Sequence, residues 1–524
     1  MVDLKALELV TESIPCSITV EINEFLTKPL TATEVLIALK TMSPDKSPGS
    51  DGMPAMFYEN YWHIVGSIVT EVFLGVLNDG YSMDSINTSI ITLILKIKAP
   101  CGMADFRPIS LCKVIYKLIF KMLVIRFKEA LPLVISKSQS TFLSNRLITD
   151  NILVAFELVH HIQHRTRGGK SYSALKLDMS KAFDRVEWPY LWAVMKKMGF
   201  DIKWIAWIQH CLASTSLSFS LNGEVTGHAP SVSHLFFAND SLLFCETAEG
   251  SALAIRRSLD IYHRVSGQML NNKKLVMSFS PNTPVAAQTF FQQTLQMPIS
   301  ECHERYLGSP SYSGRDKKEL FSNVKERVWK LMHDWNEKQF SVGGKEVLLK
   351  AVVQSIPTFA ISCFCLTKTF CQQLESMMAN FWWGSNKDGT KIHWRRWKLL
   401  CKSKFDGGMR FRSFVHYNQA LLAKQDWRIF KMPNTLLSQL LKCRYFPNNT
   451  FLEVRLGHSP SLTWQSIQWG RELLAQGLRY KVGNGFNIYC GLDKWIPGHT
   501  EFKPIAYNEP NTLPVANFIT AEQE

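Results

Sequence analysis

Short runs and alternations of apolar residues predict several β-strands in the first half of the chain. The predicted strands cover 90–96, 174–177 and 216–223, and two apolar arms within 232–244 predict a hairpin. The run 174–177 is interrupted only by Lys176, and Asp178 follows it directly. The predicted hairpin presents Asn239 and Asp240 at its tip.

Helical periodicity accounts for most of the remaining pattern. We expect an amphipathic helix near 30–39, with Thr31 or Thr33 as its N-cap, ending at a Pro- and Gly-rich loop over 43–54. Further helices are predicted at 57–77, 116–131, up to 164, 189–198, 251–265, 317–335, 345–354 and 367–381. The order strand, helix, hairpin, helix and strand in the middle of the chain predicts an α+β layer, and the later half is mostly helical.

Asp178 is the first candidate for chemistry, because it stands where a buried strand would end. The strand would fix its side chain, and the open end of the strand would leave the carboxylate accessible to a divalent cation. From spacing alone, an aspartate in this position more often caps the next helix. Asp184 follows six residues later.

Composition describes a folded protein with an excess of positive charge. The chain has 524 residues, 46% hydrophobic and 20% charged, with a net charge of +15 and a pI near 9.2. This length allows several domains, and the charge favours a polyanionic partner. Twelve cysteines without a Cys-x-x-Cys pair, no leader-like N-terminus and no long apolar run predict a protein of the nucleus or cytoplasm, neither secreted nor membrane-bound.

Basic and aromatic residues are interleaved between residues 387 and 412. Trp382, Trp383, Trp394 and Trp397 alternate with lysines and arginines, among them Arg395, Arg396 and Lys398. Basic side chains between aromatic rings suit a nucleic-acid backbone with bases stacking beside it. Alternatively, the tryptophans form the core of a small helical domain and the basic residues form its solvated face.

Six motifs together resemble the reverse transcriptase of plant LINE-type (non-LTR) retrotransposons. In chain order they are Lys-Ser-Pro-Gly-Ser-Asp-Gly (46–52), Phe-Arg-Pro-Ile-Ser-Leu (106–111), Ser-Gln-Ser-Thr-Phe (138–142), Leu-Asp-Met-Ser-Lys-Ala-Phe-Asp (177–184), Phe-Ala-Asn-Asp (237–240) and Ser-Gly-Gln…Lys (266–274). Residues 306–308 and 381–384 resemble the region that follows the polymerase core in that family. The resemblance extends from about residue 20 to about residue 497.

The resemblance implies a right-hand polymerase with a ferredoxin-like palm, within the α+β class. The implied divisions are an N-terminal helix and fingers at 1–165, an incomplete palm at 166–300, a helical thumb or connection with the basic Trp-rich segment at 301–420, and a truncated C-terminal region at 421–524. The implied activity is RNA-directed DNA polymerisation on an RNA template with a DNA primer.

The resemblance also assigns roles to individual residues. Asp178 and Asp240 would be catalytic carboxylates that hold Mg²⁺, because hard cations prefer charged oxygen ligands. Lys274 would be a candidate general acid for the leaving pyrophosphate, and Arg107 a candidate for binding the triphosphate. The remaining acidic residue of the central motif, Asp184, is assigned a structural or sugar-side role.

Two departures from the family pattern predict an impaired site. The family reads Ala-Asp-Asp where this chain has Asn239 before Asp240, so one charged metal ligand is replaced by an amide. The family also has a Gly-Leu-Arg-Gln-Gly-Asp-Pro-Leu-Ser-Pro segment followed by a helix, and the two form one wall of the nucleotide pocket. In this chain, residues 227–231 run directly into Val232, so the segment and its helix are missing. A palm without this helix would expose apolar surface.

These observations lead to three hypotheses. The chain is an active RNA-directed DNA polymerase, or a catalytically dead remnant that binds nucleic acid through its basic later half, or a translated pseudogene without function. We expect the polymerase activity to be lost or impaired.

Overall fold

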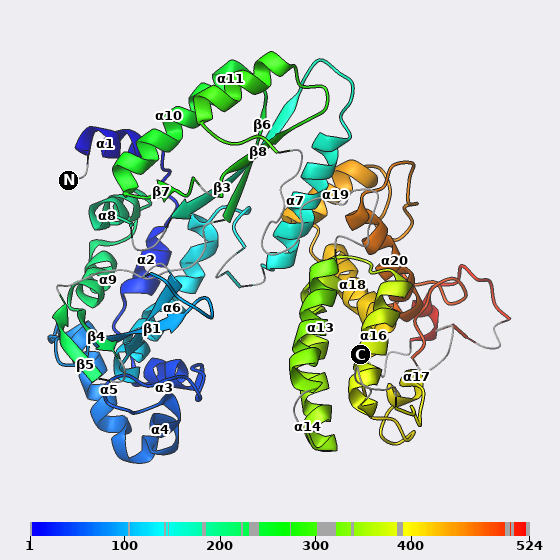
Figure 1. Cartoon of the computed structure of the whole chain (residues 1–524), viewed down its shortest axis with the longest axis horizontal. Coiled ribbons are helices and arrows are strands. Elements are labelled where there is room, and N and C mark those ends of the chain that lie inside the picture. The colour runs from blue at the N-terminus through cyan, green and yellow to red at the C-terminus, as the bar shows by residue number, and fades with distance from the viewer. Residues whose placement is uncertain are drawn as a thin grey trace. The chain divides into compact units, whose positions relative to one another are not determined.

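The computed structural model contains both helices and strands, in agreement with the predicted α+β class, and divides into two compact units. Unit 1 comprises Met1–Leu147 and Ile162–His303, and unit 2 comprises Ile148–His161 and Glu304–Glu524 (Figure 1). The structure describes residues 3–102, 105–140, 143–144, 146–180, 185–221, 224–229, 240–272, 274–300, 321–336, 340–384, 391–497, 503–504 and 508–519, with the backbone alone at 219–221, 224–229 and 240.

Unit 1 contains two small sheets, and the second of them positions Asp178. The strands are β1 (Thr88–Leu95), β2 (Phe106–Cys112), β3 (Tyr172–Ser180), β4 (Ser216–Leu221), β5 (Glu224–Ala229), β6 (Asp240–Glu246), β7 (Met269–Leu270) and β8 (Val276–Phe279). The first sheet has the order β2-β1-β4-β5, in which only the β1–β4 pair is parallel. In the second, β3 is central, with β6 on one side and β7 and β8 on the other, all antiparallel.

The strands predicted from the apolar pattern at 90–96, 174–177 and 216–223 correspond to β1, β3 and β4. Strand β2 was not predicted, because Pro108 lacks a backbone donor and argues against a strand. It is accommodated because β2 is the edge strand of its sheet. The predicted Asn-Gly turn at 222–223, the hairpin arm with Asn239, Asp184 and segment 306–308 lie outside the described residues.

Helices surround the sheets of unit 1. They are α1 (Leu4–Glu12), α2 (Val20–Thr27), α3 (Ala32–Lys40), α4 (Ala55–Asn60), α5 (Trp62–Asn78), α6 (Val114–Val134), α8 (Trp188–Lys197), α9 (Ile202–Ala213), α10 (Glu249–Ser266) and α11 (Val285–Leu295). Helices α10 and α11 cover one face of the β3 sheet (Figure 1), where Leu175 and Leu177 pack with Phe291 and Leu295. Because side chains alternate along a strand, Asp178 belongs to the opposite face.

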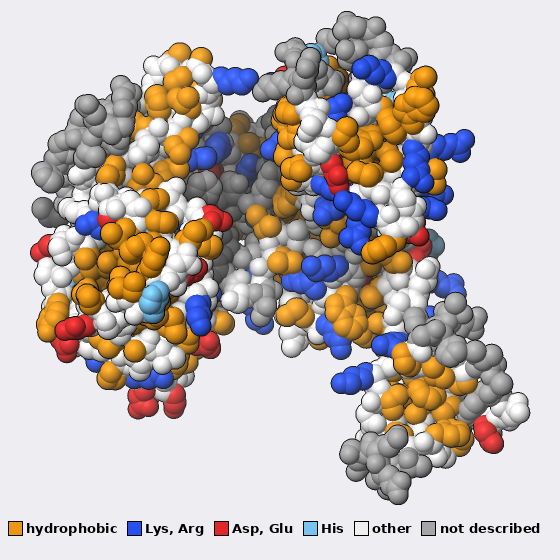
Figure 2. All heavy atoms as spheres, turned by 90° about the horizontal axis from the view of Figure 1, so that it is seen from below, with side chains coloured by type: hydrophobic (Ala, Val, Ile, Leu, Met, Phe, Trp, Pro, Cys, Tyr) orange, Lys and Arg blue, Asp and Glu red, His pale blue; other side chains and the backbone are white. Residues whose placement is uncertain are grey.

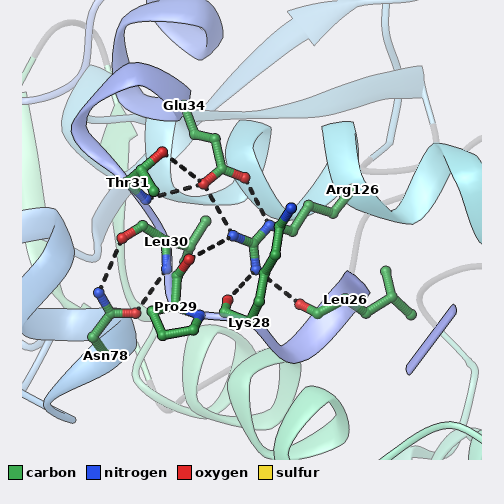
Figure 3. Close-up of polar contacts among 8 residues, drawn as sticks. All are labelled: Leu26, Lys28, Pro29, Leu30, Thr31, Glu34, Asn78 and Arg126. Atoms are coloured by element: carbon green, nitrogen blue, oxygen red, sulfur yellow. Dashed lines mark hydrogen bonds and ion pairs between the residues drawn. The ribbon is translucent and has the colours of Figure 1, made fainter. Parts of the chain in front are cut away.

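A buried arginine on α6 holds the N-terminal segment of unit 1 in place (Figure 3). The Arg126 side chain is almost completely buried and forms a two-pronged ion pair with Glu34, at 2.8 and 3.0 Å. The same guanidinium donates to the backbone carbonyl groups of Leu26, Lys28 and Pro29. The five donors of an arginine suit this arrangement, which a lysine could not reproduce.

Among its described residues, unit 2 consists mainly of helices and also contains an isolated β-bridge between Tyr489 and Pro514. Its helices are α7 (Ile148–Gln163), α13 (Ser322–Asn336), α14 (Val342–Val347), α15 (Thr358–Cys363), α16 (Lys368–Trp383), α17 (Trp397–Leu400), α18 (Phe414–Lys431), α19 (Leu436–Tyr445) and α20 (Leu462–Gly477). Helix α7 contributes Ile152, Leu153 and Phe156 to the same core as Phe364 and Trp464. Its apolar face is therefore buried among helices that follow it by nearly two hundred residues or more.

Most predicted helices are present, with one correction. The helical pattern predicted at 57–77 corresponds to α4 and α5, which are separated only at Tyr61. The helix predicted at 345–354 passes from α14 into a π-helical turn (Leu348–Val352) and a 3-10 turn (Val353–Ser355), in a stretch rich in β-branched valine.

Two further expectations about the helices can be compared with the structure. Thr31 caps α3 in a capping box with Glu34, as one of the two predicted caps. Within the described ranges, every helix is too short or too polar to cross a membrane.

Candidate functional site

The candidate site in unit 1 contains Asp178, which lies near the C-terminal end of strand β3. Asp178 is only 4% exposed, and in the antiparallel register its Cα lies opposite that of Asp240, the first residue of β6. Strand pairing therefore brings together two acidic residues that are 62 positions apart in the sequence. The Asp240 side chain and the whole of Asn239 lie outside what the structure describes.

A turn between β7 and β8 supplies the polar partners of Asp178. Asn271 donates from its backbone N–H to the carbonyl oxygen of Asp178 and from its side-chain Nδ2 to Oδ2, both at 2.8 Å. Lys274 Nζ lies 3.1 Å from the same Oδ2. The structure thus places Lys274 beside Asp178 and adds Asn271, which the sequence analysis missed, while the role of Lys274 as a general acid stays a prediction. The signal for Asn271 was an asparagine directly after the short strand Met269–Leu270.

The described donor set does not match a two-metal centre. Among the residues that the structure describes, no three His, Cys, Asp or Glu side chains are grouped so as to hold a metal ion. Asp178 is a suitable hard ligand by chemistry, but its Oδ2 already accepts an amide hydrogen bond and an ammonium ion pair. Asp178 and Asp240 as metal ligands therefore remain a prediction.

Arg107 belongs to the other sheet of unit 1. It is an exposed residue of the edge strand β2, with its Cα opposite that of Ile94 in β1. It is not one of the partners of the Asp178 carboxylate, which are Asn271 and Lys274. Its predicted role in binding a triphosphate stays a prediction.

A pocket of about 280 Å³ lies beside the site in unit 1 but is separate from the Asp178 carboxylate. Its lining includes Met179, Leu270 and Asn272, together with Arg256 and His263 of α10. Met179 follows Asp178 in β3, so the two side chains point to opposite faces of the sheet. The pocket is therefore on the α10 side and is not part of the predicted catalytic face.

The basic segment of unit 2, residues 391–412, contains the short helix α17 between irregular stretches and carries exposed cations. Arg396 and Lys398 are exposed, and the Arg395 guanidinium donates to the carbonyl oxygen of Gly407. The Trp397 ring stacks on Phe411 with centroids 4.8 Å apart, which attaches the loop to the core. On the face of unit 2 seen in Figure 2, basic side chains predominate over acidic ones.

The four tryptophans divide between the core of unit 2 and its surface. Trp382, Trp383 and Trp397 pack against the core of unit 2, as the structural alternative predicted. Trp394 is 79% exposed and lies in sequence beside Arg395 and Arg396. One aromatic ring is thus available beside exposed cations, whereas three are used for folding.

Comparison with known proteins gives a family assignment. Residues 95–232 match the family described as reverse transcriptase (RNA-dependent DNA polymerase). This match includes Arg107 and Asp178 and ends seven residues before Asn239.

Three relatives illustrate the range of similar proteins. An uncharacterized mitochondrial protein of Arabidopsis thaliana is 47% identical over 152 residues, which are 29% of this chain and 99% of that protein. A protein of Arabidopsis thaliana whose name refers to ribonuclease H is 31% identical over 196 residues, 36% of this chain and 31% of the relative. A 149 kDa protein of transposon TX1 from Xenopus laevis is 30% identical over 203 residues, 39% of this chain and 15% of the relative.

The last two alignments span less than a third of the relatives concerned, so they describe shared segments and not whole proteins. The first covers its relative almost completely at high identity. The chain therefore belongs to the family of this mitochondrial protein, and it contains a reverse-transcriptase-like domain.

Proposed function

We propose that this chain is a reverse-transcriptase-like protein derived from a non-LTR, LINE-type retrotransposon, and that its polymerase site no longer transfers nucleotides. The reverse transcriptase match and the similarity to a transposon protein support the origin. The order of motifs from 46 to 274 supports the LINE-type subclass. In this proposal the fingers, palm and thumb follow the divisions inferred from the motifs.

The main support for an inactive polymerase site comes from the surroundings of the Asp178 carboxylate. It is buried near the end of β3, opposite the Asp240 position, and a lysine already balances its charge. Asn239 stands where the family has a further carboxylate. Asp178 and Asp240 would have to hold Mg²⁺ with one negative charge fewer than the family pattern, and loss of one preorganised electrostatic partner typically lowers a rate by about 10²–10³-fold.

Primer extension on an RNA template with Mg²⁺ or Mn²⁺ tests the loss of activity directly. We expect no incorporation by the full chain, and no recovery in Asn239→Asp, because the missing pocket wall is not restored by that change. Asp178→Ala is the control for any residual signal. Incorporation by the wild-type chain that Asp178→Ala abolishes would disprove the proposal, and recovery in Asn239→Asp would show that the missing segment is dispensable.

A retained nucleic-acid-binding function is the second candidate, and the exposed loop at Trp394, Arg396 and Lys398 favours it. Each phosphate contact releases counterions, so the affinity should fall steeply with salt. Neutralising Arg396 and Lys398 to Gln should weaken binding to an RNA–DNA duplex and reduce the salt slope by roughly 1 to 2.

The matched control for this binding experiment is the double variant of Lys424 and Lys442 to Gln, which removes two exposed lysines from α18 and α19 of the same unit. The control should bind like the wild-type chain. Arg395 is better tested separately, because its contact with Gly407 supports the loop itself. Equal losses in both double variants, or an affinity independent of salt, would contradict a binding role for the loop.

A further inference from the structure

The basic segment of unit 2, residues 391–412, carries the two most exposed large hydrophobic side chains among the residues that the structure describes. Phe405 is 94% exposed and Trp394 is 79% exposed, whereas Trp397 and Phe411 of the same segment belong to the core or pack against it. Exposed rings contribute little to folding, because hydrophobic stabilisation depends on the apolar area removed from water. Two such rings in one short segment indicate a binding surface.

A tight turn holds Phe405 away from the core. The Gly408 N–H donates to the Ser403 carbonyl oxygen at 2.8 Å, and the Ser403 hydroxyl donates to Asp406 Oδ2 at 2.7 Å. Gly407 has a φ of 70°, a conformation that glycine adopts without strain. The turn is thus closed by its own backbone and side chains, and it presents the Phe405 ring to solvent from a fixed position.

The stretch that carries Trp394 is joined to this turn. The Arg395 guanidinium donates to the Gly407 carbonyl oxygen, so the residue after Trp394 contacts the turn that carries Phe405. The two exposed rings therefore belong to one connected part of unit 2, which lies beside α17 in Figure 1.

Cations accompany both rings along the chain. The basic segment contains eight lysines and arginines and a single aspartate, and all eight basic residues are exposed. Arg395 and Arg396 follow Trp394 directly, and Lys404 precedes Phe405. This alternation of rings and positive charges matches a ligand in which bases alternate with phosphates.

The exposed rings favour one kind of polyanion over the others. In a duplex the faces of the bases are stacked on one another, whereas in a single strand they are open to an aromatic side chain. A lipid surface would also accept rings and cations, but the reverse transcriptase match of residues 95–232 favours a nucleic acid as the partner.

We propose that the basic segment binds single-stranded nucleic acid, with unpaired bases stacked on Trp394 and Phe405 and the phosphates between them paired with the neighbouring cations. This inference rests on the nucleic-acid-binding function proposed above and names its substrate class. It separates two contributions to affinity. Phosphate contacts are common to all nucleic acids and depend on salt, whereas stacking requires unpaired bases.

The test compares a short oligo(dT) strand with a duplex of equal length, each bound to the full chain and followed by fluorescence anisotropy at several salt concentrations. The double variant Trp394→Ala, Phe405→Ala should bind oligo(dT) at least about tenfold more weakly than the wild-type chain, because two stacked bases are lost. Its affinity for the duplex should change by less than about twofold, and the salt slope should stay the same, since no charge has been removed.

A conservative variant and a matched control sharpen this test. Trp394→Phe, Phe405→Trp keeps both rings and should restore most of the affinity for oligo(dT). The control is Trp329→Ala, Phe486→Ala, which removes a tryptophan and a phenylalanine of the same unit that are 52% and 67% exposed. It should bind oligo(dT) within about twofold of the wild-type chain.

Three results would overturn the inference: oligo(dT) binding that does not depend on the two rings, an equal loss on the duplex, or an equal loss in the control. Binding to phosphatidylserine vesicles that falls with the two rings, while oligo(dT) binding does not, would assign the surface to a membrane instead. Each single variant, Trp394→Ala or Phe405→Ala, should lose part of the affinity, so the test stays decisive if the double variant does not fold. Salt-dependent binding that requires Arg396 and Lys398 but neither ring would overturn this inference and leave the proposed nucleic-acid binding intact.

Discussion

Two buried carboxylates, one in each unit, are stabilised in opposite ways. Asp178 in unit 1 relies on Asn271 and on the largely exposed Lys274, both from one short turn. Glu157 of α7 in unit 2 is fully buried and is enclosed by side chains from more distant elements. Its partners are Arg444 Nη1 at 3.1 Å, the Tyr445 hydroxyl at 2.9 Å and the Ser461 hydroxyl.

The two carboxylates differ in their cationic partners: the partner of Glu157 is fixed by the fold, and the partner of Asp178 is exposed to water. Burial raises the pKa of Glu157, and its contacts with Ser461, Arg444 and Tyr445 offset part of that increase. Arg444 also donates to the Glu157 backbone carbonyl oxygen and to His160, so its position is fixed several times over. A partner held in this way cannot leave without unfolding, whereas the largely exposed Lys274 side chain can move into water.

The largest expected effect is on the stability of unit 2 in Arg444→Ala. Removing the arginine leaves the buried Glu157 carboxylate without its charged partner, which typically costs about 3–5 kcal/mol. Hydrogen–deuterium exchange should show faster exchange in α7 and α19 together, because Glu157 and Arg444 connect these two helices. Urea denaturation provides the change in the free energy of unfolding.

Lys274→Met is the matched comparison in unit 1. The partner that it removes is largely exposed, so we expect a loss of about 1 kcal/mol or less. Faster exchange should be confined to the turn at 271–274 and the end of β3. Equal losses of unfolding free energy in Lys274→Met and Arg444→Ala would contradict this expectation. They would show that the exposure of the cation does not determine how strongly each carboxylate depends on its partner.

Of the site in unit 1, only strand β3 and the position of Asp178 on it could be predicted from the local sequence pattern. An apolar run that ends in Asp178 is a local pattern, and the strand β3 follows from it. Lys274 was accessible only through the resemblance, because its contact with Asp178 depends on the register in which β7 and β8 pair with β3. Asn271 was missed because a turn asparagine usually satisfies only its own backbone.

The contacts of Glu157 in unit 2 could not be predicted from the sequence. The pattern correctly predicted α7 as a helix, but Glu157 and Arg444 are 287 positions apart, and no local signal relates them. The same limit applies to Arg126, whose carbonyl partners lie about one hundred positions earlier. Contacts of this kind are determined by the packing of whole helices, which periodicity alone does not specify.

A third carboxylate, Asp426 of α18 in unit 2, extends the comparison to a group without a partner. Its side chain is fully buried, and neither oxygen accepts a hydrogen bond from the described residues. Burial raises the pKa of Asp426 well above its ordinary value, and the Arg471 guanidinium offsets this only in part. Folding therefore favours the protonated form.

The raised pKa of Asp426 determines how this residue makes the stability of the protein depend on pH. Below about pH 4, the ordinary pKa of aspartate, the folded and unfolded states both hold the proton and the contribution to stability is complete. As the pH rises towards the higher pKa of the folded state, the unfolded state loses its proton first and stability falls. Asp426→Asn cannot ionise, so at pH 8 its free energy of unfolding should exceed that of the wild-type chain, by a margin that grows as the pH rises.

Urea midpoints measured from pH 4 to pH 8 would show this difference as two curves that meet at low pH and separate as the pH rises. Asp334→Asn, at an exposed position of α13 in the same unit, is the matched control and should follow the wild-type curve. Parallel curves for Asp426→Asn and the wild-type chain would mean that Asp426 ionises normally in the folded state. In that case water or a local rearrangement must solvate the Asp426 carboxylate. Burial in the structure would then not be sufficient to predict which carboxylates of this protein need a charged partner.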